Sequence, residues 1–372
     1  RFYCGKGKIM SVIWTIIAFI VIFSLLVVVH EFGHFIVAKA NGIAVTEFGV
    51  GMGPKLLGFH HKGTDYVLRA LPIGGACVFE EEDPFDDEDD EAKKEEDPME
   101  SSKEEYGGKF SDATLAARIA TTLAGPAFNI LLGFILAMII VGICGENDTR
   151  IGGIVEGSAA ESAGLMEGDR ILSINGERVH LFTEILLLTL TERTDAWEIE
   201  YVRDGKEYTA HATLSTSEDG RYLGIYAADK INCANIKIFE YSFFEVRYWL
   251  KATFKSLGML FTGRLTKDDV SGPVGVAQVI GSTINQTKDY GFLVVFVNLA
   301  DIALLLSVNL AIMNLLPFPA LDGGRLIFLL AELIIRKKVP RKFEAVTTLI
   351  GFGALMVIMV LVLFNDVSRF FR

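Results

Sequence analysis

The sequence predicts a polytopic α-helical membrane protein with four transmembrane helices and an inserted β-rich domain. Of its 372 residues 51% are apolar, and the mean hydropathy is +0.39. Between the second and third apolar stretches, a long segment has soluble character and begins with the alternation of apolar and polar residues that is typical of strands. Four apolar stretches are each about the 20 residues that cross a hydrocarbon core, at 12–29, 119–143, 291–316 and 345–364.

The first apolar stretch is expected to be a transmembrane helix and not a signal peptide. Lys6 and Lys8 precede it as a basic start would, but no small-residue cleavage site follows it. Met10 has the position of a natural start, so residues 1–9 are expected to be an upstream extension.

An acidic run follows the first helix. Residues 80–105 hold 16 Asp or Glu and 3 Lys, which leaves 32 basic and 31 acidic residues elsewhere, although the formal net charge is −12. Such a run buries too little apolar surface to fold. We therefore predict a disordered, solvated loop over 80–112.

The soluble segment predicts a small β-rich domain with one helix. A turn is expected at Asn175-Gly176, a hairpin around Asp204-Gly205, and a helix over 182–193. Because no nucleophile or ligand cluster stands out in this domain, its chemistry is expected to be binding.

The next segment, 231–289, is expected to lie at the membrane surface. Residues 238–263 are too charged to cross a membrane and are typical of an amphipathic interfacial helix, and 271–281 predicts a turn followed by a short helix. The basic cluster after the third span, with Arg336 and Lys342 at its ends, places that connection in the cytoplasm by the positive-inside rule. The β-rich domain and both termini are then extracytoplasmic.

The first apolar helix contains His30-Glu31-Phe32-Gly33-His34. On a helix, H-E-x-x-H puts both imidazoles on one face, one turn apart, where they can bind one zinc ion while the Glu acts on a water. Ionisable residues inside a span are rare and usually functional. The motif therefore predicts a catalytic zinc site with Glu31 as general base.

A catalytic zinc site usually has a third protein ligand. His60 and His61 are expected to be solvated, and His180 and His211 belong to the β-rich domain. The third ligand must therefore come from another residue type.

Asp322 is the better candidate for that ligand. It follows Pro317 and Pro319, which break the third span, and precedes Gly323-Gly324, which we expect to loosen the chain. His30 lies roughly 30 Å from the outer start of the first span, and the third span runs inward to Asp322. The histidine pair and Asp322 are therefore both expected near the cytoplasmic side of the membrane.

These residues resemble the site-2 protease family of intramembrane zinc metalloproteases, bacterial RseP type with a single PDZ domain, over about 11–364. The family's H-E-x-x-H matches 30–34, and its N-x-x-P-x-P-x-x-D-G pattern matches 314–323. FGVGMGPKL and TDYVLRALPIGG resemble its membrane re-entrant β-hairpin, and LAGPAFN resembles its second-span motif. The inserted domain resembles a circularly permuted PDZ domain, with YLGI in the place of the carboxylate-binding strand.

The resemblance implies one Zn²⁺ ion and further site residues. Asn129 and Asn314 are expected near the catalytic centre; an interhelical hydrogen bond is the equally weighted alternative for Asn129. Gly125 and Pro126 are expected to provide close packing and a kink. Candidate substrate-binding residues are Gly49, Gly51 and Gly53 in the hairpin and Leu223, Gly224 and Ile225 in the PDZ-like domain.

The expected function is hydrolysis of peptide bonds within transmembrane segments of single-span proteins, such as anti-sigma factors or remnant signal peptides. The expected partners are these substrates, the lipid bilayer and an upstream site-1-type protease, with no nucleic acid. The expected location is the plasma membrane, with the active site toward the cytoplasm. The expected segments are 1–40, 41–79, 80–112, 113–145, 146–230, 231–289, 290–324 and 325–372.

Two other functions fit parts of the sequence. A non-catalytic membrane scaffold would use the PDZ-like domain to bind tails but would not need Glu31. An ion or solute transporter would explain broken helices and polar residues such as Asp301, but it predicts internal repeats, which the sequence lacks.

Overall fold

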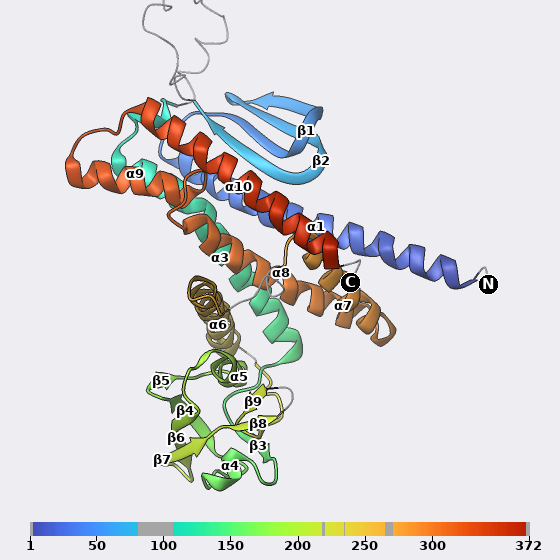
Figure 1. Ribbon diagram of the computed structural model, residues 1–372. Coiled ribbons are helices and arrows are strands. Elements are labelled where there is room, and N and C mark those ends of the chain that lie inside the picture. The colour runs from blue at the N-terminus through green and yellow to red at the C-terminus, as the bar shows by residue number, and fades with distance from the viewer. Residues whose placement is uncertain (1–2, 81–106, 218–219, 234, 265–270, 370–372) are drawn as a thin grey trace, which may run out of the picture. The chain divides into compact units, whose positions relative to one another are not determined.

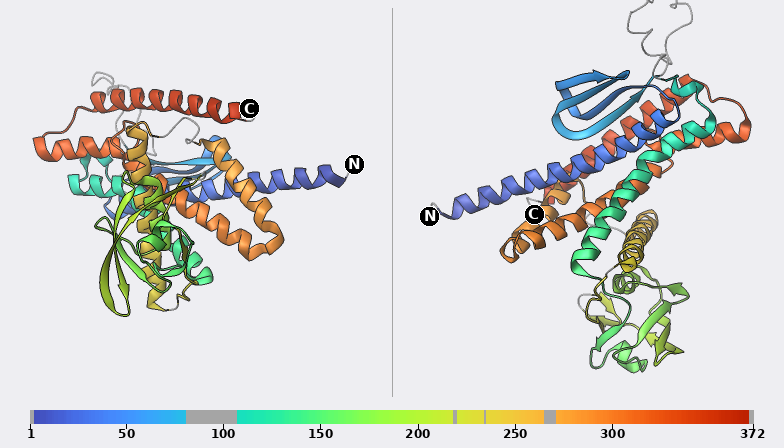
Figure 2. Two further views of the ribbon diagram at one scale, coloured as in Figure 1. Left: turned by 60° about the horizontal axis from the view of Figure 1, so that its bottom comes forward. Right: turned by 180° about the vertical axis from the view of Figure 1, so that it is seen from behind.

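The structure is a computed structural model that describes residues 3–80, 107–217, 220–233, 235–264 and 271–369. The chain forms two compact units, one of residues 1–133 with 266–372 and one of residues 134–265 (Figures 1 and 2). The loop predicted to be disordered spans 80–112, of which residues 81–106 lie outside the described residues. At 107–112 the prediction is wrong, because Phe110–Asp112 form a short 3-10 helix and Phe110 is buried.

Within the described residues, four helices are long and apolar enough to cross a membrane. They are α1 (Tyr3–Ala40), α3 (Leu115–Cys144), α8 (Phe292–Leu315) and α10 (Arg341–Arg369). The chain is thus a polytopic α-helical membrane protein. The first unit also contains η3 (Phe110–Asp112), α7 (Pro273–Thr287), η4 (Lys288–Tyr290) and α9 (Asp322–Ile335).

Small residues let α3 approach both α1 and α8 closely. A Cβ atom on Gly33 of α1 would lie 2.5 Å from the carbonyl oxygen of Ala124, and one on Gly133 would lie 3.2 Å from Val308. Ser307 of α8 donates a hydrogen bond of 2.7 Å to the backbone oxygen of Asn129. Such close packing and interhelical hydrogen bonding drive helix association in lipid, and here they hold α3 against α1 and α8.

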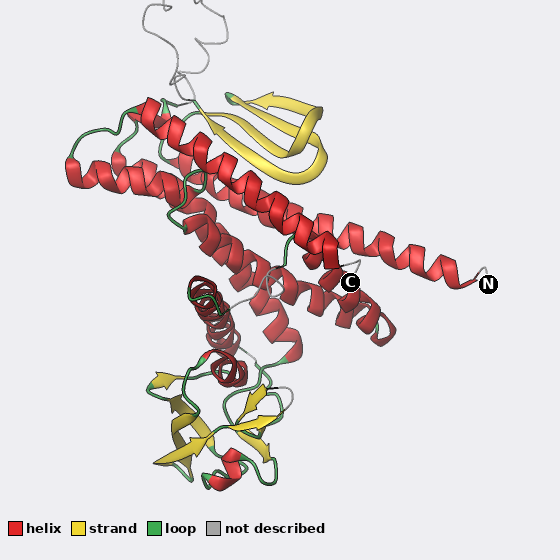
Figure 3. Cartoon of the chain, in the orientation of Figure 1, coloured by secondary structure: helices red, strands yellow, loops and turns green. Residues whose placement is uncertain are grey.

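The hairpin after α1 is folded back on itself (Figure 3). It consists of β1 (Val45–His61) and β2 (Thr64–Phe79), joined at Lys62-Gly63. Glu47 pairs with both Asp65 and Val78, so the first half of β1 lies between two parts of β2. Residues 75–79 therefore form an edge of this sheet, and Gly75 contacts α1 beside Glu31.

The second unit contains the β-rich domain, with a four-stranded sheet in the order β5-β4-β6-β7 and two small strand pairs, β10-β3 and β8-β9. Trp197, Ile171 and Leu188 are buried at its centre. The predicted hairpin at Asp204-Gly205 joins β6 and β7. The elements are β3 (Ile151–Ile154), α4 (Ala159–Ser162), β4 (Arg170–Ile174), β5 (Glu177–Arg178), α5 (Phe182–Thr191), β6 (Ala196–Arg203), β7 (Lys206–Thr213), β8 (Ser215–Ser217), β9 (Gly220–Tyr222) and β10 (Ile225–Ala227).

Helix α6 (Ile236–Phe261) belongs to this second unit. Lys251 and Lys255 both form ion pairs with Glu177, and Arg247 hydrogen-bonds His180 at 2.6 Å. The sequence segment 231–289 is therefore not one element, because α6 packs on the β-rich domain while α7 lies in the other unit. Helix α6 also exposes several apolar side chains: Ile236, Phe239, Phe243, Phe254 and Phe261.

The third span ends earlier than the segment 290–324. Helix α8 stops at Leu315, and Asp322 begins the separate helix α9, which occupies much of the connection assigned to 325–372. Our expectation that Gly323 and Gly324 loosen the chain is wrong. Both are buried in the first turn of α9, and a Cβ atom on Gly323 would lie 2.1 Å from the carbonyl oxygen of Leu316. These glycines allow close packing of backbone on backbone.

Candidate metal centre

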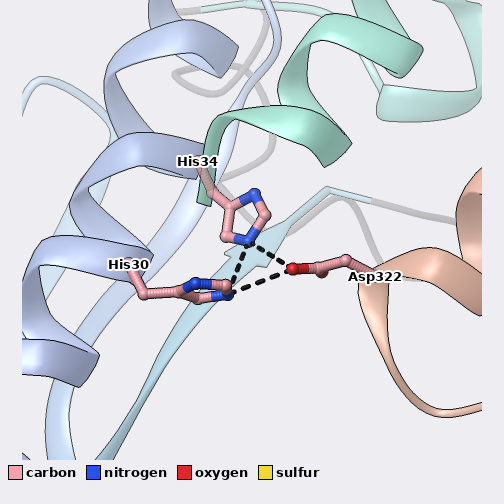
Figure 4. Close-up of side chains that lie close together, drawn as sticks. All are labelled: His30, His34 and Asp322. Atoms are coloured by element: carbon pink, nitrogen blue, oxygen red, sulfur yellow. Dashed lines mark hydrogen bonds and ion pairs between the residues drawn. The ribbon is translucent and has the colours of Figure 1, made fainter. Parts of the chain in front are cut away.

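The structure brings His30 and His34 of α1 together with Asp322 of α9 (Figure 4). The Nε2 atoms of the two histidines are 3.2 Å apart, and Oδ2 of Asp322 lies 3.1 Å from His30 Nε2 and 3.4 Å from His34 Nε2. Both histidines are buried. Among the described residues this is the one group of three or more His, Cys, Asp or Glu side chains that could hold a metal.

The triangle has the dimensions of three ligands around zinc. Two atoms that each lie about 2.0–2.1 Å from a tetrahedral ion are roughly 3.3–3.4 Å apart, which matches the three distances within a few tenths of an ångström. Oδ2 of Asp322 is buried and has no hydrogen bond of acceptable angle within the described part of the chain. Converging nitrogen and oxygen lone pairs repel unless a cation or a proton lies between them, so these residues fit a zinc ion.

Helix α3 closes the back of this site. Nδ1 of His34 lies 2.8 Å from the carbonyl oxygen of Thr121 and donates to it, which leaves Nε2 as the free lone pair. Gly125 stands directly behind the imidazoles, where a Cβ atom would lie 2.3 Å from His34 Nε2 and 2.7 Å from His30 Cε1. Only glycine leaves room for both imidazoles, so the expected close packing at Gly125 takes place against the histidine pair.

The two asparagines reach different atoms of His30. The amide nitrogen of Asn314, at the end of α8, lies 3.4 Å from Nε2, on the metal-binding side. The amide of Asn129 lies 3.2 Å from Nδ1, on the far side of the ring. Asn314 can therefore face a bound substrate, whereas Asn129 contacts the back of a ligand.

Glu31 opens on a cavity of about 240 Å³ beside the triangle. The carboxylate accepts a hydrogen bond from the backbone N–H of Cys77, in the edge strand of the hairpin. The base is thereby held between its own helix and that edge strand. The cavity lining mixes apolar and polar groups: Val27, His30, Glu31, Leu310, Asn314, Ala320, Leu321 and Asp322.

The other candidates lie elsewhere. His60 and His61 are exposed at the end of β1, where His60 pairs with Asp65, and His180 and His211 belong to the β-rich domain. Asp301 is exposed on α8. None of these residues lines the cavity.

The candidate substrate-binding residues fall in two places. Gly49, Gly51 and Gly53 lie in β1, where Gly51 and Gly53 have φ of +88° and +91°. Leu223 and Gly224 join β9 to β10, and Ile225 pairs with Ile154 of β3. Across the described strands, β10 has a hydrogen-bonded neighbour on one side alone, β3.

Sequence reasoning missed two contributions to the site, the Thr121 carbonyl and the Cys77 N–H. Both are backbone groups, so no residue type marks them. The sequence does contain a weak signal for Thr121. Thr121, Gly125 and Asn129 are spaced four residues apart, so they share one face of an apolar helix.

Known proteins resemble the chain along most of its length. A sequence pattern for Peptidase family M50 matches residues 18–358. Zinc metalloprotease RasP of Geobacillus kaustophilus is 32% identical over 425 residues, covering 96% of this chain and 98% of that protein. The regulator of sigma-W protease RasP of Bacillus subtilis is 31% identical, covering 96% and 99%. The solved PDZ domain of an SdrC-like protein from Listeria monocytogenes is 20% identical, with a TM-score of 0.20, and covers 22% of this chain and 90% of that structure.

Proposed function

The chain belongs to Peptidase family M50 and is a zinc metalloprotease of the site-2 protease type, and from that premise we propose that it hydrolyses peptide bonds inside the transmembrane segments of single-span proteins. One observation carries the proposal. The histidine pair and Glu31 lie on α1, within the candidate span Ser11–Ala40, and converge on a carboxylate from another helix. Hydrolysis within a membrane needs such a set of groups at a depth where isolated charges are costly.

We propose that His30, His34 and Asp322 hold the zinc ion. When bound, zinc polarises a carbonyl group and makes a water a good nucleophile at neutral pH. Glu31 removes the proton from that water and delivers it to the leaving amine. Asn314, whose amide shares the cavity with Glu31, orients the substrate carbonyl. The support for these roles is the triangle of 3.1–3.4 Å and the cavity that Glu31 and Asn314 line together.

A transmembrane substrate must unwind before cleavage, since a helical backbone satisfies its own amides. We propose that the edge strand at 75–79 pairs with the unwound segment by strand addition. Gly75 contacts Glu31, and the Cys77 N–H reaches its carboxylate, so a peptide paired to this edge would pass the base. We also propose that Gly49, Gly51 and Gly53 in the neighbouring strand let the hairpin bend around that peptide.

We propose that the β-rich domain selects substrates outside the membrane, by size or by binding an exposed C-terminus. The free side of β10 and the adjoining Leu223, Gly224 and Ile225 suit strand addition by such a terminus. The name of the B. subtilis relative, regulator of sigma-W protease, favours an anti-sigma factor as substrate; a remnant signal peptide is the other class. An upstream site-1-type protease would first trim the substrate outside the plasma membrane, with both termini of this chain on that side.

The test is a Glu31→Gln variant in membranes. It should keep the fold and the zinc content, lose cleavage of a membrane-span reporter, and retain uncleaved substrate, which mass spectrometry then identifies. Glu156→Gln, an exposed carboxylate of the second unit, is the matched control and should cleave normally. Undiminished turnover by purified Glu31→Gln protein would overturn the assignment of Glu31 as the base, whereas a parent protein that binds zinc but cleaves no reporter would favour the non-catalytic scaffold.

A further inference from the structure

Asn129 is a buried polar residue whose position does not suit contact with substrate. Its side chain is fully buried in α3 (0% exposed), and the amide contacts Nδ1 of His30. Asn129 is absent from the residues that line the cavity, whereas Asn314 is among them. A substrate bound in the cavity would therefore meet the amide of Asn314 and not that of Asn129.

The amide oxygen of Asn129 points to a different role. Oδ1 is buried and has no hydrogen-bond partner within the described part of the chain, while Nδ2 is the atom 3.2 Å from Nδ1 of His30. A neutral imidazole carries one proton, so if Nε2 of His30 offers its lone pair to zinc, Nδ1 carries the proton and needs an acceptor. A half-turn of the amide exchanges Nδ2 and Oδ1, and this single rotation gives the proton an acceptor and the orphaned oxygen a donor.

We propose that Asn129 is a positioning residue for the metal centre, and that its amide oxygen accepts the Nδ1 proton of His30. This contact fixes the ring in the tautomer and orientation in which Nε2 faces the ion. Outer partners of this kind are typical of metal-bound histidines and usually use a carboxylate or a backbone carbonyl. Here a side-chain amide on a transmembrane helix takes the same role.

The second histidine supports this assignment, because it has the same arrangement from the same helix. Nδ1 of His34 donates to the Thr121 carbonyl at 2.8 Å. Thr121, Gly125 and Asn129 recur every four residues on one face of α3, so acceptors stand on either side of the glycine that makes room for the rings. Helix α3 therefore orients both imidazoles while supplying no ligand of its own.

A further hydrogen bond reaches the backbone of Asn129 and not its amide. Ser307 of α8 donates a hydrogen bond to the backbone oxygen of Asn129. The side chain of Asn129 thus projects from backbone that is tied to the helix leading into Asp322. Because this contact leaves the Asn129 amide untouched, Ser307 offers a matched control.

The inference rests on His30 being a zinc ligand, and the experiment separates the two claims. Zinc affinity of the purified full chain is measured by competition with a chelator, and the cobalt-substituted protein reports ligand geometry by its visible absorption. Asn129→Asp keeps an acceptor and cannot donate, so it should bind zinc at least as tightly as the parent. Asn129→Leu has the same number of side-chain heavy atoms in the same branched arrangement and no acceptor, so it should bind about 10- to 100-fold more weakly and shift the cobalt spectrum.

The remaining variants separate a role of Asn129 as acceptor from a role as donor and from a purely structural role. Ser307→Ala should lower thermal stability and leave zinc affinity unchanged. An Asn129→Asp protein that loses zinc affinity would overturn the inference, because it would show that the amide acts as a donor. Parental affinity in Asn129→Leu would also overturn it, provided that His30→Ala loses zinc. If His30→Ala binds zinc normally, the ligand assignment itself fails.

Discussion

Replacing Gly125 by alanine should abolish zinc binding while the chain still folds. The new Cβ atom would lie 2.3 Å from Nε2 of His34 and 2.7 Å from Cε1 of His30. Ordinary contacts between such atoms are about 3.5–4.0 Å, so the rings must retreat by roughly 1 Å. The ligand triangle has sides of 3.1–3.4 Å, and a shift of that size moves a ligand out of bonding range.

The same substitution has an opposing effect on the helix. Alanine is favoured over glycine inside a helix by about 1 kcal/mol, and α3 is a regular helix through Gly125 except at Pro126. Folding stability of the metal-free protein should therefore change little. Turnover should fall by about 100-fold or more, since a misplacement of 1 Å can cost that much in rate, and zinc content should fall with it because the rings leave bonding range.

Gly142→Ala is the matched control, because Gly142 is also in α3 and a Cβ atom there would meet nothing closer than Ile238 at 3.9 Å. Atomic absorption on both purified variants gives zinc stoichiometry, and a membrane-span reporter gives turnover. Gly142→Ala should match the parent in both assays. Full zinc content and normal turnover in Gly125→Ala would refute the view that the glycine makes room for the ligands.

Three further outcomes follow from the structure. Asp322→Ala should lose most of the bound zinc and Asp322→His should regain part of it, while Asp301→Asn should keep full zinc by atomic absorption; the reverse result would identify Asp301 as the ligand. Burial and the Arg247 guanidinium lower the pKa of His180; the second unit should therefore be most stable above the ordinary histidine range and lose stability as the pH falls below about 6.5. Thermal midpoints of the parent at about pH 7.5 and about pH 5.5 should show this fall, and His180→Gln should flatten it. Asp366 is buried and accepts hydrogen bonds from two N–H groups at the start of α7. Asp366→Ala should therefore lower the stability by roughly 1.5–3 kcal/mol, and an unchanged melting temperature would contradict that contact.

Local sequence patterns carry much of the fold and most of the candidate site. The apolar stretches predict the span helices because their length is set by the membrane, and H-E-x-x-H predicts a histidine pair because both residues lie on one helix. Asp322 can be predicted from the sequence because the prolines at 317 and 319 break an apolar helix beside its carboxylate. The structure brings His30, His34 and Asp322 together, as the similar expected depth of His30 and Asp322 in the membrane predicts.

Contacts between distant helices could not be predicted in the same way. The position of Gly125 against His34 depends on how α1 and α3 pack, which no local period encodes. The docking of α6 was missed for a related reason. The charges of 238–263 predict a membrane-surface helix, but two of them, on Lys251 and Lys255, form ion pairs with Glu177 of the β-rich domain. A charged face indicates a polar neighbour but does not distinguish water from a protein surface.

The position of Asp322 depends on backbone contacts more than on side chains. Ala320, two residues earlier, has φ of +79°, a conformation that costs a non-glycine residue about 1–3 kcal/mol unless its surroundings enforce it. The enforcement comes from two glycines that approach this loop: a Cβ atom on Gly324 of α9 would lie 2.4 Å from the carbonyl oxygen of Phe318, and one on Gly351 of α10 would lie 2.4 Å from that of Pro319.

Helices α9 and α10 therefore hold the loop before Asp322 from two directions, while α3 orients the histidines from behind. A ligand fixed by backbone packing cannot relax when one side chain changes. Asp322 is consequently held in place by backbone packing, and zinc affinity should respond more strongly to these glycines than to Glu31 or Asn314, which line the cavity without being proposed ligands.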